Sequence, residues 1–122
     1  MRAGETFLLL GSDDHLWAII SDPAMDPQHV VIVLFVSWAE KYDQACILHK
    51  GQHPFIKHDT CVRFLGARVE TDAKLEQLLR SGKLRRKDPL SADVLGLIRQ
   101  KAECSDMPLG AYEVLRQQGF VP

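Results

Sequence analysis

The sequence predicts a mostly-β domain whose last third is helical, and three observations carry this prediction. Residues 1–70 hold short apolar runs separated by turn-forming residues, which is typical of strands. After residue 70, apolar residues recur at helical spacing behind residues that cap helices. The length of 122 residues and the 46% apolar share suit one domain with its own core.

Five strands are expected in the first two thirds of the chain. Residues 30–37 (VVIVLFVS) form the strongest candidate, because β-branched residues dominate and both faces are apolar. A strand with two apolar faces is expected at the centre of a sheet. Gly, Asp and Pro residues supply the turns, at 11–14, 22–27 and 51–54. The expected strands span residues 6–10, 16–21, 30–37, 45–48 and 60–65.

Three helices are expected in the last third. Thr71 or Asp72 can cap the first helix and Ser91 the second, because their side-chain oxygens accept bonds from free backbone N–H groups. Apolar residues then repeat every three or four positions, which gives each helix one face to bury. The expected helices cover about residues 72–80, 92–103 and 109–118.

Composition and charge narrow the class of protein. Fifteen basic and sixteen acidic side chains give a net charge of −1, so no overall basic field marks a nucleic-acid binder. The longest apolar run, residues 30–38, is about half of what spans a bilayer, and the N-terminal stretch lacks the apolar length of a signal peptide. We therefore expect a cytoplasmic protein that makes no membrane contact. Its cysteines, Cys46, Cys61 and Cys104, are expected to be reduced, half-buried thiols.

The charged residues are distributed unevenly, and the sign of the charge changes near residue 72, where the expected strands give way to the expected helices. Residues 1–72 carry six basic and ten acidic groups, a charge of −4, whereas residues 73–122 carry nine basic and six acidic groups, a charge of +3. One short stretch holds five cations, which indicates either a solvated linker or a patch that contacts phosphates. We call it the basic cluster, and it consists of Arg80, Lys83, Arg85, Arg86 and Lys87.

A polar cluster with three of the five histidines lies in the stretch CILHKGQHPFIKHDTCVR, residues 46–63. Histidine suits proton transfer near neutral pH, and lysine or threonine can hold a phosphate or a developing oxyanion. The cluster indicates a site that handles phosphodiesters, or else a polar loop whose histidines cap turns. Its densest part is His53, Lys57, His58, Asp59 and Thr60.

Cysteines and histidines in the same stretch also have a spacing that zinc could use. These residues are Cys46, His49, His53, His58 and Cys61. One argument against a metal site is that the apolar residues at 54–56, inside the cluster, look like residues that pack into the core. The two ends of a strand over 46–49 would also point to opposite faces of the sheet. We therefore expect no metal and no other cofactor.

Four segments carry a resemblance to a known family: an early Gly-Glu, the strands HLWAIISDP and VVIVLFVSW, and the block GQHPFIKHDTCVRFLGARV. Together they resemble small bacterial proteins related to the PemK/MazF growth-inhibitor toxins of toxin–antitoxin modules. The pattern HPFIKH-x-T-x-V with the following Ala-Arg, and the tail LSADVLGLIRQKAECS, are similar to a PemK-like subgroup. The resemblance covers roughly residues 4–105.

This resemblance implies a small SH3-like barrel of five to seven strands with packed helices, usually a homodimer with an antitoxin-like protein partner. Active relatives are endoribonucleases that cut RNA without a metal and use the 2′-hydroxyl as nucleophile. Their usual site groups are an arginine and a threonine or serine, with an acidic or histidine partner. Ser37 matches the threonine or serine position, but Asp14 and His15 stand where the family has its arginine.

Roles for the candidate residues follow from the chemistry of RNA cleavage. We expect His58 or His15 to take the proton of the 2′-hydroxyl, and the other histidine or His53 to protonate the leaving 5′-oxygen. Cations steady the phosphate and hydroxyl groups orient it. The candidate catalytic residues are His15, Ser37, His53, Lys57, His58 and Thr60. The candidate RNA-binding residues are Arg63, Arg80, Lys83, Arg85, Arg86 and Lys87.

A non-catalytic interaction module is the alternative function. The same barrel would then bind an antitoxin peptide or a regulatory protein, and both the missing arginine and the net charge of −1 favour this. In either case we expect Trp17 and Trp38 in the core, together with the pair Phe55 and Ile56.

Overall fold

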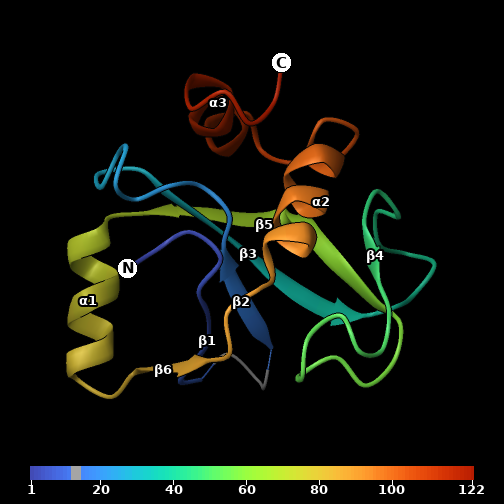
Figure 1. Cartoon of the computed structure of the whole chain (residues 1–122), viewed down its shortest axis with the longest axis horizontal. Helices are drawn as coiled ribbons and strands as arrows, with labels where there is room; N and C mark the ends of the chain where they lie inside the picture. The colour runs from blue at the N-terminus through green and yellow to red at the C-terminus, as the bar shows by residue number, and fades with distance from the viewer. Residues whose placement is uncertain (12–14) are drawn as a thin grey trace.

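The computed structural model describes residues 1–11 and 15–122, which form a six-stranded antiparallel sheet and three helices (Figure 1). Residues 12–14, part of the turn expected at 11–14, lie outside the described residues. The strands are β1 (Thr6–Leu9), β2 (Leu16–Ile19), β3 (Val30–Ser37), β4 (Ile47–Leu48), β5 (Thr60–Glu70) and β6 (Leu84–Lys87). The helices are α1 (Asp72–Arg80), α2 (Ala92–Ala102) and α3 (Leu109–Gln117).

The strands follow the order β4-β5-β3-β2-β1-β6 across the sheet. β3 lies in the interior of this order, between β5 and β2, and its residues from Val30 to Val36 are buried. The prediction of a central strand with two apolar faces is therefore confirmed. The mostly-β class with helices after residue 70 is confirmed as well.

The expected SH3-like barrel is not confirmed, because the sheet is not closed. β4 and β6 are its edges, and no pairing within residues 1–11 and 15–122 joins them. The open sheet leaves one side of each edge strand without a neighbouring strand.

Two apolar cores lie on the two faces of the sheet, because successive side chains along a strand point to opposite faces. One core joins Val33 and Phe64 to α2 and α3. The other joins Trp17 and Ile32 to Leu75 of α1. In Figure 1, α2 and α3 accordingly lie on the opposite side of the sheet from α1.

Two of the helices, α1 and α2, begin at the caps that the sequence predicted. Thr71 Oγ1 accepts a hydrogen bond from the backbone N–H of Lys74 at 3.1 Å, and Ser91 Oγ accepts one from Val94 at 3.2 Å. After α1 the chain turns through Gly82, whose φ of 76° is accessible to glycine at little cost. This turn leads directly into β6.

Two strands differ from the prediction. No strand was expected at β6, whose cations indicated a solvated linker or a phosphate-contacting patch, but Leu84 is buried and anchors the following charged residues beside β1. β5 was expected to end at Leu65, but it continues to Glu70 through an irregularity. There Ile32 pairs with Arg68 and Leu34 with Arg63, so β5 has more residues than β3 between the two pairings.

The expected core residues divide into two groups. Trp17 and Ile56 are buried, as expected. Trp38, with 46% of its surface exposed, and Phe55, with 39% exposed, contradict the prediction that they lie in the core. Trp38 follows the last residue of β3, and its Nε1–H donates to Gln44 Oε1 at 2.6 Å.

The three cysteines are free thiols in different environments. Cys46 and Cys61 are buried, whereas Cys104 is exposed. Burial raises the pKa of the Cys46 thiol to about 11, because the thiolate would lose its hydration. Among the described helices, none is long and apolar enough to cross a membrane.

Candidate functional site

The candidate site lies where the longest pair of strands ends. Ser37 is the last residue of β3 and Thr60 is the first residue of β5, and the two are directly opposite each other in the ladder. The loop between β4 and β5 carries the polar cluster and returns to this end of the sheet. The rigid sheet therefore positions a loop rich in chemically active side chains.

A pocket of about 270 Å³ opens at this place and brings together five of the six candidate catalytic residues. His15 enters from the residue before β2, Ser37 and Thr60 from the strand ends, and Lys57 and His58 from the loop. The complete lining is His15, Phe35, Val36, Ser37, Phe55, Ile56, Lys57, His58 and Thr60.

The contact between Ser37 and His58 is the best-defined polar interaction in the pocket. Ser37 Oγ and His58 Nε2 lie 2.8 Å apart, and which of them donates depends on the imidazole tautomer. Thr60 Oγ1 donates to the backbone carbonyl of His58 at 2.9 Å, which holds the loop against the strand. Both side chains of the Ser37–His58 pair are exposed and can reach a ligand.

A cation and a second imidazole complete the polar lining. Lys57 is exposed and has no acidic partner within hydrogen-bonding range in the part of the chain that the structure describes. His15 is half-buried and lines the same pocket. The pocket can therefore offer two imidazoles, one ammonium group and two hydroxyls to a ligand.

Apolar side chains form the rest of the pocket wall, and sequence reasoning did not identify them as site residues. Phe35 and Val36 are the last buried residues of β3, and Ile56 is buried beneath the loop. Phe55 lines the pocket while keeping 39% of its surface exposed. Phe35 and Val36 directly precede Ser37 on the same strand, and this proximity is the signal that could have indicated them.

His53 is not brought to the pocket, although it was predicted to act there. Its side chain is buried, and Nε2 contacts the carbonyl oxygen of Asp88 and, at 3.4 Å, the hydroxyl of Thr6. Its Nδ1 accepts a hydrogen bond from the backbone N–H of Phe55 at 3.0 Å. Both ring nitrogens are thus bound to the protein, so His53 ties the loop to the start of β1 and the end of β6.

Arg63 is also separate from the pocket. It pairs with Leu34 across the sheet, and its guanidinium lies 5.6 Å from the centre of the Tyr42 ring. Because Thr60 and Arg63 are an odd number of residues apart on β5, their side chains leave opposite faces of the sheet. Arg63, a candidate RNA-binding residue, therefore does not add its charge to the Ser37–His58 pocket.

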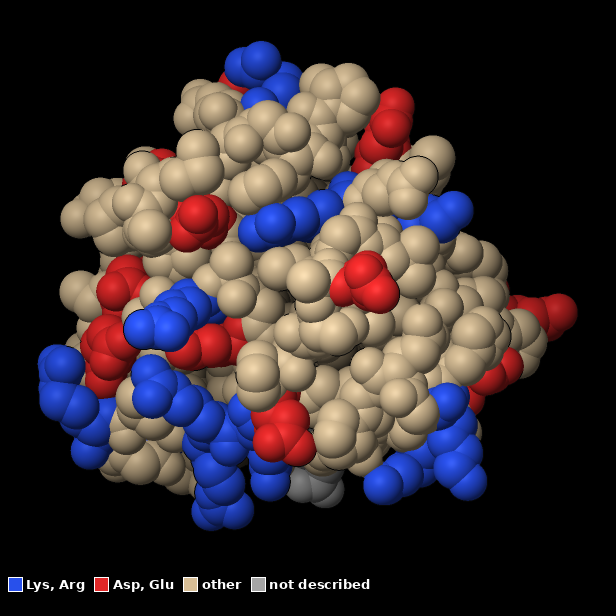
Figure 2. Space-filling view, in the orientation of Figure 1, with Lys and Arg blue, Asp and Glu red and all other residues tan. Residues whose placement is uncertain are grey.

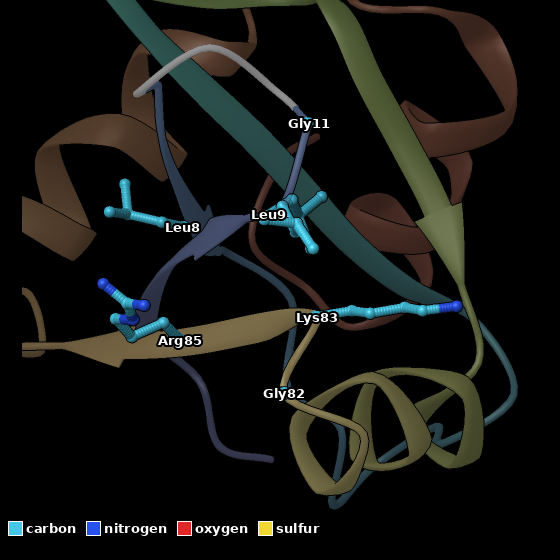
Figure 3. Close-up of a pocket in the computed structure, with 7 residues that line it drawn as sticks. Leu8, Leu9, Gly11, Gly82, Lys83 and Arg85 are labelled. Carbon is cyan, nitrogen blue, oxygen red and sulfur yellow. The ribbon is translucent and has the colours of Figure 1, made fainter.

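The basic cluster lies at the end of α1 and along β6. Figure 2 shows basic side chains gathered over this part of the molecule. A second pocket, of about 330 Å³, lies here between the end of β1 and the start of β6 (Figure 3). It is lined by Leu8, Leu9, Leu10, Gly11, Gly82, Lys83 and Arg85.

The residues considered for zinc do not come together. Among the described residues, the structure contains no group of three or more His, Cys, Asp or Glu side chains that could hold a metal ion. His49 instead lies 2.8 Å from Asp59 through Nδ1, and both side chains are largely exposed.

We compared the chain with models of protein families, with curated proteins and with solved structures, and none of them matches it significantly. The assignment of a function therefore depends on the pocket and on the sequence resemblance.

Proposed function

We propose that the chain is a PemK/MazF-like, toxin-type protein that binds RNA in the Ser37–His58 pocket and cleaves it without a metal. The observation that carries the proposal is the 2.8 Å contact between Ser37 Oγ and His58 Nε2 in a pocket that Lys57 and His15 also line. On this proposal the open sheet is a variant of the SH3-like barrel. The protein would work in the cytoplasm as a homodimer.

The proposed reaction is an attack of the 2′-hydroxyl on the adjacent phosphorus. His58 accepts the proton of this hydroxyl as the O2′–P bond forms. His15 donates a proton to the 5′-oxygen as the P–O5′ bond breaks, which leaves a 2′,3′-cyclic phosphate and a free 5′-hydroxyl. His53 is not available for either step, because its two ring nitrogens are already bound within the protein.

The remaining polar residues act on the phosphate and on the base. Lys57 supplies the positive charge that balances the growing charge on the phosphate oxygens. Ser37 holds the imidazole of His58 in one orientation, and Thr60 fixes the backbone of His58 through its carbonyl. The ring of Phe55, with 39% of its surface exposed, offers a surface against which a nucleobase can stack.

The test is cleavage of a mixed-sequence single-stranded RNA in the presence of a chelator. We expect the wild-type protein to cut it, and His58→Ala to lower the rate at least about 100-fold, because proton transfer is lost. Lys57→Ala should lower the rate as well. His29→Ala is the matched control, because His29 is an exposed histidine 3.0 Å from Asp26 and does not line the pocket.

A protein-interaction module remains the second candidate, because the apolar residues of the pocket also suit a peptide side chain. The absence of the family's arginine favours this alternative. Two negative results would favour this second function over the nuclease. The folded wild-type protein would leave RNA intact, and its induced expression would not arrest bacterial growth.

A further inference from the structure

We propose that the outer edge of β6 binds an extended, acidic segment of a partner protein, which adds to the sheet as a further strand. This site is separate from the Ser37–His58 pocket and does not depend on the proposed nuclease activity. Four features of the edge carry the proposal: backbone groups and cations that have no partner among the described residues, an exposed apolar side chain and a neighbouring pocket.

The first feature is the set of backbone groups that β6 turns outward. The N–H of Leu10 donates to the carbonyl of Lys83 at 2.8 Å, which fixes the phase of the ladder between β1 and β6. With this phase, Arg85 directs its N–H and C=O toward β1, whereas Leu84 and Arg86 direct theirs away from the sheet. Within residues 1–11 and 15–122, these outward groups have no backbone partner.

The second feature is the charge along this strand. Arg85 and Lys87 leave the same face of β6, both are exposed, and neither has an acidic partner in the described part of the chain. Arg86 leaves the other face, where its Nε lies 3.7 Å from Glu5 Oε2. A strand added beside β6 would therefore be favoured by Asp or Glu at alternate positions, next to Arg85 and Lys87.

The third and fourth features lie where β6 begins. Leu10 has 80% of its surface exposed and lines the pocket of about 330 Å³ together with Leu8 and Lys83. Figure 3 shows Leu8 and Arg85 side by side on the neighbouring strands, with Lys83 extended in a different direction. An apolar residue that follows the acidic positions of the added strand can therefore be buried at this pocket.

A second copy of this chain fits the edge poorly. Two β6 edges paired with each other would bring Arg85, Arg86 and Lys87 close to their own copies, and like charges on facing strands repel. Single-stranded RNA would satisfy the cations but would leave the backbone groups of Leu84 and Arg86 unpaired. An acidic extended peptide satisfies both sets of groups, which is why we favour it.

Amide hydrogen exchange of the full chain tests the proposal residue by residue. The probe is a blocked synthetic peptide that alternates Glu with Val and ends in Leu. On binding, we expect exchange at the amides of Leu84 and Arg86 to slow at least about tenfold, because these amides become hydrogen-bonded. Arg85 and Lys87 serve as internal controls, because their amides are already paired with β1 in the free protein.

Substitutions separate the backbone contribution from the charge contribution. Arg86→Pro removes both the side chain and the outward N–H and should abolish peptide binding, whereas Arg86→Ala removes the side chain, keeps this N–H and should bind nearly as the wild type does. Arg85→Ala should weaken binding about fivefold, and Lys74→Ala on α1 should leave it unchanged. Should Arg86→Pro fail to fold, the same peptide N-methylated on the residues that face Leu84 and Arg86 removes the same bonds.

Two results would overturn the proposal. One is equal affinity for the N-methylated and the unmodified peptide, or no slowing of exchange at Leu84 and Arg86. The other is tight binding of a homopolymeric RNA that depends on Arg85 and Lys87, together with no binding of the peptide. The second result would make the basic cluster a phosphate-contacting patch, which is one of the two alternatives that the sequence left open.

Discussion

At the scale of single residues, His53 and His58 belong to one loop but have different environments. His58 is exposed beside Ser37, whereas His53 is buried beneath the loop and contacts the carbonyl of Asp88. The sequence could not separate the two, because both lie in one polar stretch and no apolar periodicity marks which imidazole faces the core. Only the folding of β1 and β6 brings Thr6 and Asp88 to His53, and these contacts are distant along the chain.

His53→Ala should lower the free energy of unfolding by about 2 kcal/mol, because the loop loses a buried side chain whose two ring nitrogens bind the carbonyl of Asp88 and the backbone N–H of Phe55. Replacement of the exposed His58 by alanine should change it by less than about 0.5 kcal/mol. Urea denaturation of the two variants measures both effects. Equal stability of the His53 variant and the wild type would contradict the structural role given to His53.

Cys46 makes the stability of the fold sensitive to alkaline pH. Burial raises its pKa from an ordinary value of 9.0 to about 11, so the unfolded chain releases this proton at a lower pH than the folded chain does. Stability from the protonated thiol is therefore fully present below pH 9.0 and is lost as the pH rises to about 11. Denaturation across this range should show a loss of about 2 kcal/mol that is absent in Cys46→Ala. An equal loss in the variant would show that other groups cause it.

At the scale of elements, the sequence predicted the strands and helices whose apolar residues repeat with a clear period. β3 and the caps of α1 and α2 agree with the prediction, because both features depend on residues that are close together in the sequence. β6 was missed because three of its four residues are charged, so no alternation of apolar and polar residues marks it. It forms because Leu84 packs into the core beside α1 and its backbone pairs with β1.

Gly66 allows β5 to bend past β3. A Cβ atom at this position would lie 2.6 Å from Leu34 Cδ2, which is too close for two carbon atoms. Because the end of a leucine side chain can shift, we expect Gly66→Ala to cost about 1 to 2 kcal/mol of unfolding free energy rather than to prevent folding. Thermal or urea denaturation measures this cost.

Gly96 in α2 provides the matched control for that substitution. Nothing lies within 4 Å of a Cβ added there, and the residue is inside a helix. Gly96→Ala should therefore raise the free energy of unfolding by about 0.5 to 1 kcal/mol, because alanine favours the helix. A Gly66 variant as stable as the Gly96 variant would show that the bend in β5 does not require glycine.

At the scale of the whole molecule, the topology decides which side chains meet. The antiparallel pairing of β3 with β5 places Ser37 opposite Thr60, and the loop before β5 adds Lys57 and His58. Lys57, His58 and Thr60 were predictable, because they belong to one dense polar cluster in the sequence, whereas the apolar wall of the pocket was not predicted. Which members face the pocket, and the open form of the sheet, were not predictable, because both depend on contacts between distant segments.

The central claim is that this pocket cleaves RNA through the 2′-hydroxyl group. The most direct measurement compares an RNA oligonucleotide with a copy that carries a single 2′-deoxy nucleotide at the cleaved position, both incubated in chelator. We predict that the protein cuts the first to a 2′,3′-cyclic phosphate and leaves the second intact, and that His58→Ala cuts neither. Cleavage of the 2′-deoxy copy at the same position, or full activity of His58→Ala, would contradict the account.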